Sequence, residues 1–301
     1  MAYIPISNQY IESFSGTINS YFFGGGFNNE FSASTGCCIY SGIENAIQGE
    51  YNAIIAGSGN TAYGSFNTII NSSDCLFGFE STNRFCAFIN SDNCFFDGSG
   101  SEYSSVISTS SSYLKEVLNS SIVGGAGNSM QAINPPDVEN CVIAGGENNT
   151  IAFYASANNC FIGGGYGNKI SGQSNLMYNS AIIGSKNSTI QSSGSLGECA
   201  SIIASYGSTI DISGNKNTAI IGCDSMSVSS LNHAVFLGFS SDTIGTKVSN
   251  RTYVDSLHID RVLQMKPRTT VPAASDGLVF YSANTGLMVC VGSTWKLVTA
   301  V

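Results

Sequence analysis

Short clusters of large apolar residues recur along the whole chain and alternate with stretches rich in Gly, Ser and Asn. Each copy of the pattern has a small or polar residue, two large apolar residues, a Gly/Ala/Ser pair, an Asn-rich turn and a further apolar residue. The clearest copies contain Ile122-Val123, Val142-Ile143, Phe161-Ile162 and Ile182-Ile183. Such short apolar runs bounded by turn residues predict β-strands, because Gly and Asn accept the positive φ angles of tight turns.

Thirteen copies follow one another at spacings of 15 to 21 residues. They begin at Phe22, Cys38, Ile54, Ile69, Phe88, Val106, Ile122, Val142, Phe161, Ile182, Ile202, Ile220 and Phe236. A repeat of this size cannot bury its own apolar face, so successive copies must stack. The pattern predicts an all-β fold, a parallel β-helix or β-roll solenoid with two short strands per coil, widened near residues 70–115, where the repeat loses its glycines.

The paired apolar residues predict that this solenoid does not work alone. Side chains of a strand point alternately to its two faces, so one member of each pair faces the core and its neighbour faces outward. Leaving the outward set in water would forgo about 20–40 kcal/mol per chain, which favours a homotrimer. The predicted trimer core is Ile122, Val123, Val142, Ile143, Phe161, Ile162, Ile182, Ile183, Ile202, Ile203, Ile220 and Ile221.

Charge is scarce and unevenly placed. Only 10% of residues are charged, and the net charge is −9. Residues 1–246 carry five Lys/Arg against seventeen Asp/Glu, a net of −12, whereas residues 247–301 carry six against three, a net of +3. The acidic body argues against nucleic-acid binding, and the change of sign marks a domain boundary near residue 247.

Ten cysteines raise the question of disulfides or metal sites. Cys38, Cys141 and Cys160 stand at or beside the apolar pair of a repeat, where other copies carry Ile, Val, Ser or Ala. The sequence has no Cys-x-x-Cys and only two histidines. We therefore expect buried, reduced thiols, no metal, no cofactor, and assembly in a cytosol.

Three segments are expected: an N-terminal attachment segment (1–19), a repeat shaft (20–246) and a C-terminal β domain (247–301). The N-terminus lacks the basic region and apolar core of a signal peptide. No apolar run approaches the ~18 residues of a membrane span, so membrane insertion is not expected.

The shaft repeats, most clearly those from 120 to 225, resemble the head repeats of trimeric autotransporter adhesins, whose β-rolls trimerise side by side. The coils here are longer and less regular, and the signal peptide and membrane anchor of that family are not found. The resemblance implies a trimeric β-roll and the possibility of a bacterial surface adhesin.

The C-terminal segment resembles the ends of phage tail-fibre and spike proteins. The resemblance rests on a strand, a Pro-rich link, Asp276-Gly277 followed by a hairpin, and Gly292-Ser293-Thr294-Trp295. From the residues alone, 278–281 and 287–291 flank a turn and predict a β-hairpin that caps the solenoid. Trp295 and Tyr281 are candidate ligand-binding residues, because aromatics supply contact area at low entropic cost; Trp295 serves equally well as a plug of the cap core.

These observations together favour a viral or phage fibre or spike that is structural and binds a host-cell receptor, for which a glycan is one candidate. Its N-terminus would bind other virion proteins, its place would be the virion surface, and assembly would occur in the host cytoplasm. No catalysis is expected. The alternatives are a bacterial surface adhesin and a glycan-depolymerising tailspike, for which Asp92, Asp97 and Glu102 offer carboxylates.

Overall fold

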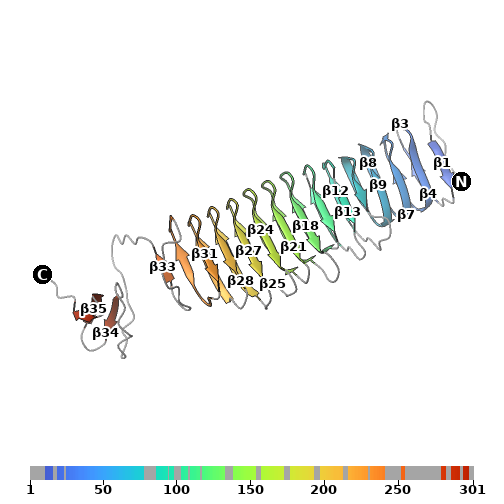
Figure 1. Ribbon diagram of the computed structural model, residues 1–301. Helices are drawn as coiled ribbons and strands as arrows, with labels where there is room; N and C mark the ends of the chain where they lie inside the picture. Colours follow the sequence, from blue (N-terminus) through green and yellow to red (C-terminus); the bar gives the residue numbers. More distant parts are fainter. Residues whose placement is uncertain are drawn as a thin grey trace. The chain divides into compact units, whose positions relative to one another are not determined.

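The computed structural model forms two compact units, residues 1–255 and 256–301. It describes residues 11–15, 19–23, 25–77, 86–93, 95–97, 103–107, 109–115, 117–132, 138–153, 157–172, 177–192, 197–212, 216–229, 231–240, 252–254, 279–282, 286–291 and 294–297. Within these ranges every regular element is a β-strand. The first unit is a parallel β-solenoid (Figure 1), which confirms the predicted fold class.

One long side of the solenoid is a sheet of thirteen parallel strands, called sheet A here. It contains β1 (Ile11–Ser15), β4 (Asn29–Thr35), β7 (Ala46–Glu50), β9 (Thr61–Ser65), β11 (Leu76–Phe77), β13 (Phe95–Asp97), β15 (Tyr113–Lys115), β18 (Ser129–Ala132), β21 (Thr150–Phe153), β24 (Lys169–Gly172), β27 (Thr189–Ser192), β29 (Thr209–Asp211) and β31 (Ser227–Ser229).

The facing side, sheet B, is also parallel throughout. Its main strands are β2 (Tyr21–Phe22), β5 (Cys38–Ile39), β8 (Ala53–Ser58), β10 (Thr68–Ser73), β12 (Ala87–Ile89), β14 (Ser105–Ile107), β17 (Ser121–Val123), β20 (Val142–Ala144), β23 (Phe161–Gly163), β26 (Ala181–Ile183), β28 (Gly197–Ile203), β30 (Lys216–Ile221), β32 (Val235–Leu237) and β33 (Thr252–Val254). Every one of the thirteen predicted repeat starts lies in one of these strands.

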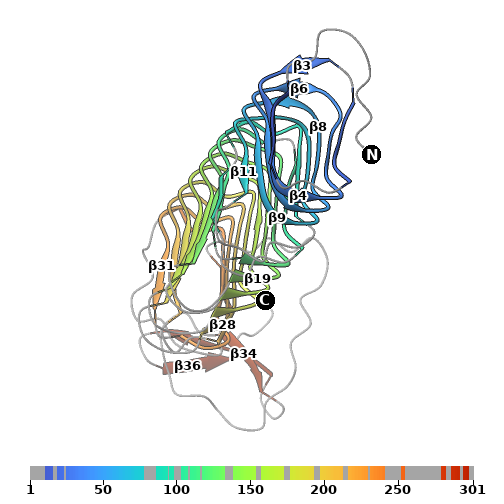
Figure 2. The ribbon, with the colours of Figure 1, turned by 90° about the vertical axis from the view of Figure 1, so that its right-hand side faces the viewer.

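Coils differ in the number of strands that they hold. The coil with β8 and β9 has the two predicted strands. Additional short pairs extend sheet B in other coils: β3 (Gly26–Phe27) with β6 (Gly42–Ile43), and the series β16 (Val117–Leu118), β19 (Val138–Glu139), β22 (Ala157–Asn158) and β25 (Met177–Tyr178). Figure 2 shows the coils stacked in register. The widening expected near 70–115 falls partly on residues 78–85 and 98–102, outside the described residues.

The core of the solenoid consists of side chains stacked from coil to coil. In the three-residue strands of sheet B from β12 to β32 the central residue faces inward, and Ile122, Ile182 and Phe236 have no exposed surface. Sheet A contributes a facing column that includes Met130 and Ile190, also fully buried. Apolar burial between the sheets is the main stabilising term, since each coil alone is too small to exclude water.

A ladder of buried Asn and Ser side chains runs along one corner of the core. Asn149 Oδ1 accepts the backbone N–H of Asn168 at 3.0 Å, and Asn168 Oδ1 accepts that of Ser188 at 3.1 Å. Asn149 Nδ2 donates to the Gly165 carbonyl at 3.2 Å. Each Asn side chain thus forms hydrogen bonds with a backbone N–H and a backbone carbonyl in the turns of the following coil, groups that the sheets do not pair. This need explains why Asn recurs at this repeat position.

Eight cysteines have described side chains; all eight are free thiols, and six of them are buried. They occupy corner positions of the core, where Asn52 N–H donates to Cys37 Sγ and Cys160 N–H donates to Cys141 Sγ, each at 3.3 Å. The prediction of buried, reduced thiols holds for this part of the chain. The thiols act as acceptors as well as small apolar groups, which the repeat pattern did not predict.

The second unit contains an antiparallel sheet of β34 (Val279–Ser282), β35 (Gly286–Val291) and β36 (Thr294–Leu297). β34 and β35 pair where the sequence predicted a hairpin, with Ser282 opposite Gly286. Its capping role stays a prediction. β33 pairs with β32, so solenoid structure continues beyond residue 247, where the change of charge placed the boundary.

Candidate subunit interface

The outward face of sheet B carries a column of large apolar side chains, the apolar stripe. Its members occupy the third position of successive strands: Ile55, Ile70, Ile89, Ile107, Val123, Ala144, Ile183, Ile203, Ile221 and Leu237, with Phe161 completing it beside Gly163. Ile55, Val123 and Ile183 are 40%, 42% and 40% exposed. In the three-residue rungs from Ala53 to Leu237, no outward position of sheet B holds a charged residue.

Sheet A has the opposite outer face. From β18 onward its outward positions are polar or small: Ser129, Thr150, Lys169, Thr189, Thr209 and Ser227 in one column, and Gln131, Ala152, Ser171, Gln191, Asp211 and Ser229 in the other. A polar outer face is what a solvated sheet requires. The two faces of the same coils therefore differ in character, and only that of sheet B has the composition of a buried surface.

One coil shows how the apolar stripe stays continuous where its usual residue is missing. In β23 the third position is Gly163, and the first position is Phe161 instead of the usual Ala or Ser. A Cβ built on Gly163 would lie 2.7 Å from the Phe161 ring and 3.6 Å from Ile183. The Phe161 ring thus lies where the side chain of residue 163 would be, so this coil still contributes an apolar group to the stripe.

The cost of exposing the apolar stripe is smaller than the sequence estimate. Neighbouring side chains already cover about three fifths of the most exposed members, such as Ile183 at 40%, and a larger share of Ile203, Ile221 and most others. Covering the remainder is worth about 1 kcal/mol per residue, or on the order of 10 kcal/mol per chain. That corrects the ~20–40 kcal/mol derived from fully exposed side chains, yet it still equals the net stability of a typical domain.

The twelve residues predicted as trimer core separate into two groups. Six are fully buried within the chain and cannot contact a second subunit: Ile122, Ile143, Ile162, Ile182, Ile202 and Ile220. The other six face outward on sheet B: Val123, Val142, Phe161, Ile183, Ile203 and Ile221. The candidate interface is narrowed to the outward group, because the pleat sends adjacent residues to opposite faces.

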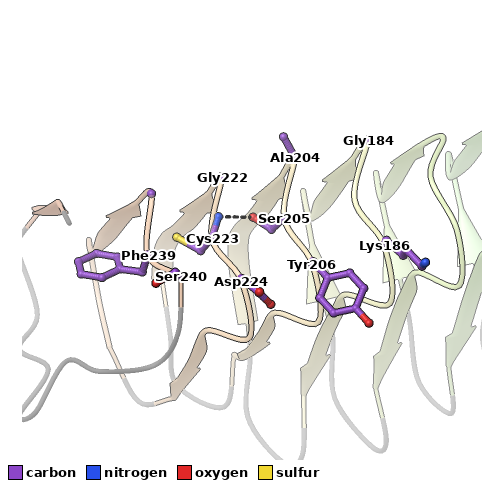
Figure 3. A pocket seen from close by; sticks show the side chains of 11 residues that line it. Gly184, Lys186, Ala204, Ser205, Tyr206, Gly222, Cys223, Asp224, Phe239 and Ser240 are labelled. Atoms are coloured by element: carbon purple, nitrogen blue, oxygen red, sulfur yellow. Dashed lines mark hydrogen bonds between the residues drawn. The ribbon is translucent and has the colours of Figure 1, made fainter. Parts of the chain in front are cut away.

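Beside the apolar stripe lies an open groove of about 490 Å³ (Figure 3). Gly184, Ala204, Gly222 and Gly238 line it together with Tyr206 and Asp224. The buried wall includes Ser205, whose Oγ accepts the N–H of Cys223 at 3.1 Å.

The outer edge of the groove carries a short ladder of alternating aromatic and basic side chains. The Lys186 ammonium lies 5.8 Å from the Tyr166 ring centroid and 5.7 Å from that of Tyr206. These cation–π contacts join three successive coils. The apolar stripe and the groove are therefore bordered by a polar rim, an arrangement typical of protein interfaces.

The other predicted site residues lie elsewhere. Trp295 on β36 is half-buried and faces Cys290 across the strands, and Tyr281 on β34 faces Leu287. Asp92 accepts a hydrogen bond from Ser73 Oγ at 2.7 Å. Glu102 and the side chains of Tyr281 and Asp97 are outside the described residues, so ligand binding at Trp295 and Tyr281 and a carboxylate pair in this region both stay predictions.

Clusters of metal-binding side chains and membrane-spanning helices are both absent from the described ranges. These ranges contain no group of three or more His, Cys, Asp or Glu side chains placed to hold a metal ion. They also contain no helix with the length and apolar character needed to cross a bilayer.

Comparison of the chain with models of known protein families and with curated proteins gives no match. The class is thus defined by the fold itself: a repetitive parallel β-solenoid, an architecture typical of fibres, spikes and adhesins.

Proposed function

We propose that the chain is the shaft-forming subunit of a homotrimeric viral fibre or spike that is structural and attaches to a host-cell receptor. The observation that carries the trimer is the uncharged apolar stripe, which follows sheet B over eleven coils. From β18 onward the outer face of sheet A in the same coils is polar or small. Cyclic symmetry about the solenoid axis covers such a stripe at every coil at once. The viral setting is supported by the resemblance of the C-terminal segment to phage fibre ends.

The size of the face suits stable self-association. Eleven strands at ~4.8 Å spacing make the apolar stripe about 50 Å long, so a partner that covers it must follow the solenoid coil by coil. A second copy of this chain is the partner that supplies an apolar strip of the same length and spacing.

The decisive experiment measures native mass by light scattering and migration in SDS without boiling. Wild-type protein is expected to have the mass of a trimer and to resist SDS. The variant Ile203→Asn/Ile221→Asn should be monomeric, because it places polar amides in the apolar stripe. The matched control Thr189→Asn/Thr209→Asn, at outward positions of sheet A, should stay trimeric. A stably folded wild-type monomer would contradict the proposal.

Two further measurements separate the alternatives. Incubation with host surface polysaccharide should give binding without shortening of the polymer, and turnover would favour a depolymerising spike. Detection of the chain in purified virions, attached through residues 1–19, supports the viral assignment; its presence on a bacterial surface instead would favour an adhesin.

A further inference from the structure

A line of glycines, with one alanine, runs beside the apolar stripe, one position further along each strand. This glycine lane consists of Gly124, Gly145, Gly164, Gly184, Ala204, Gly222 and Gly238. All seven have positive φ, from 49° at Ala204 to 78° at Gly145. Their backbone N–H groups bond to the preceding coil, as with Ala204 to the Ile183 carbonyl at 2.9 Å and Gly222 to the Ile203 carbonyl at 2.9 Å.

Backbone conformation does not by itself demand glycine in this lane. In earlier coils Asn71 and Asn90 occupy the same corner with φ of 48° and 51°, and the Asn90 N–H makes the same bond, to the Ile70 carbonyl at 2.8 Å. Over the later coils asparagine recurs at the other two left-handed corners. One corner holds Asn140, Asn159, Asn179 and Asn217 together with Cys199 and His233, and the other holds Asn148 and Asn187 together with Gly167, Gly207 and Ser225. Asn tolerates this conformation well, so its absence from seven successive positions has another cause.

Packing within the chain does not demand glycine either. A Cβ built on Gly184, Gly222 or Gly238 would meet no atom within 4 Å, and one built on Gly124 or Gly145 would meet none closer than 3.9 Å. This contrasts with Gly125, where a Cβ would fall 2.1 Å from the Gly146 carbonyl oxygen. The lane is therefore open toward the outside of the chain. Its residues Gly184, Ala204 and Gly222, labelled in Figure 3, are among those that line the groove.

We infer that the glycine lane receives the apolar stripe of a neighbouring copy of this chain. Around the three-fold axis, the apolar stripe of each subunit then packs against the glycine lane of the next. The inference rests on the proposed trimer and specifies its contact. The lane adjoins the apolar stripe over these seven coils and has the same coil spacing. The polar rim of Tyr166, Lys186 and Tyr206, continued by Glu147 and Asp224, borders it two residues further along each coil. Bare backbone admits the close approach of a partner's Ile and Val side chains. Such a contact joins unlike surfaces, and cyclic closure satisfies it for every subunit.

The test uses asparagine, because this chain places asparagine at its other left-handed corners. Gly184→Asn/Gly222→Asn should leave the circular dichroism of the solenoid unchanged and weaken assembly at least a hundredfold on dilution. Gly207→Asn is the matched control: Gly207 has φ of 58°, a Cβ there makes only ordinary contact with Ser225 at 3.6 Å, and Asn187 holds the same corner one coil earlier. The control should assemble like wild type.

A milder variant guards against misfolding. Gly184→Ala/Gly222→Ala copies the natural Ala204 and should weaken assembly about tenfold. Full assembly of the folded asparagine variant would overturn the inference, while the monomeric Ile203→Asn/Ile221→Asn variant would still support the proposed trimer. Full assembly with loss of binding to host polysaccharide would also overturn it, because the lane would then serve a glycan. A monomeric wild type would overturn both proposals together.

Discussion

At the scale of single residues, the solenoid depends on polar groups that are buried and paired across coils. Asn149 shows this most fully: it has no exposed surface, receives the Asn168 N–H and donates to the Gly165 carbonyl. A buried polar group without a partner costs more than the hydrogen bond is worth. The ladder thus stabilises the corner and penalises any shift of one coil against the next.

Replacing Asn149 with Ala is expected to lower the free energy of unfolding by about 2–4 kcal/mol, since it leaves a buried N–H and a buried carbonyl unpaired. Asn149→Ser should cost less, because Ser188 already performs the acceptor role at its own rung, toward Ser208 N–H at 3.3 Å. Urea denaturation of both variants measures the difference. Equal losses would show that the side chain fills space and is not needed as an acceptor.

The stacked buried thiols are expected to make the stability of the fold depend on pH. The hydrogen bond with Cys141 and burial raise the pKa of Cys160 well above its ordinary value. Folded and unfolded states therefore both keep the proton at pH 7, but above about pH 8.5 the unfolded thiol ionises and the folded thiol does not. Stability should fall as the pH rises through this range.

The measurement compares urea midpoints at pH 7 and pH 9.5 for wild type and Cys160→Ser. Ser180 occupies the same corner one coil later and is buried, so Ser fits the site. The variant should lose less stability between the two pH values. An identical loss would assign the alkaline effect to other groups, and rapid alkylation of Cys160 in the native protein would contradict its protection.

At the scale of strands and coils, most of the architecture could be predicted from the apolar pairs, and the reason is geometric. A period of 15 to 21 residues with two adjacent apolar residues permits a stacked parallel solenoid and little else. The same pattern could not tell which member of a pair faces inward. The buried residue is the first of the pair at Ile122 and Ile182. It is the second at Ile143 and Ile162. Register between coils decides this, because Val142 aligns with Ser121 and Phe161 with Val142.

The glycine lane and the cover over Gly163 were also beyond the sequence pattern. In the sequence every glycine predicts a turn. Only the structure distinguishes Gly184, which has open space where a Cβ would lie, from Gly125, which packs against backbone. Phe161 likewise reads as one more core residue. Its role outside the core becomes visible only when its ring is found over the neighbouring position.

The pair in β23 provides a test at this scale. Phe161→Ala should weaken subunit assembly about tenfold, because it leaves a gap in the apolar stripe. Phe161→Ala/Gly163→Ile moves the apolar volume to the position used by other coils and should restore assembly. Gly163 has no positive φ, so Ile is compatible with its backbone. Sedimentation equilibrium of both variants gives the coupling, and a double variant as weak as the single one would contradict a shared role.

At the scale of the whole molecule, the solenoid is nearly one-dimensional, since each of its described strands pairs only with strands of adjacent coils. In such a stack stability is a sum over coils and neighbour contacts, and an isolated chain frays from its ends. In a trimer with contacts at every coil such fraying is suppressed, because a coil can unfold only if it also loses its contacts with two neighbouring subunits.

Assembly should therefore convert gradual unfolding into a single cooperative step. Wild-type protein is expected to unfold in one transition whose midpoint rises with protein concentration, as for any obligate oligomer. The Ile203→Asn/Ile221→Asn variant should unfold over a broader range, independently of concentration, with amide exchange fastest in the terminal coils. Uniform exchange along the variant would mean that a single chain is cooperative by itself, and the apolar stripe would then need another explanation.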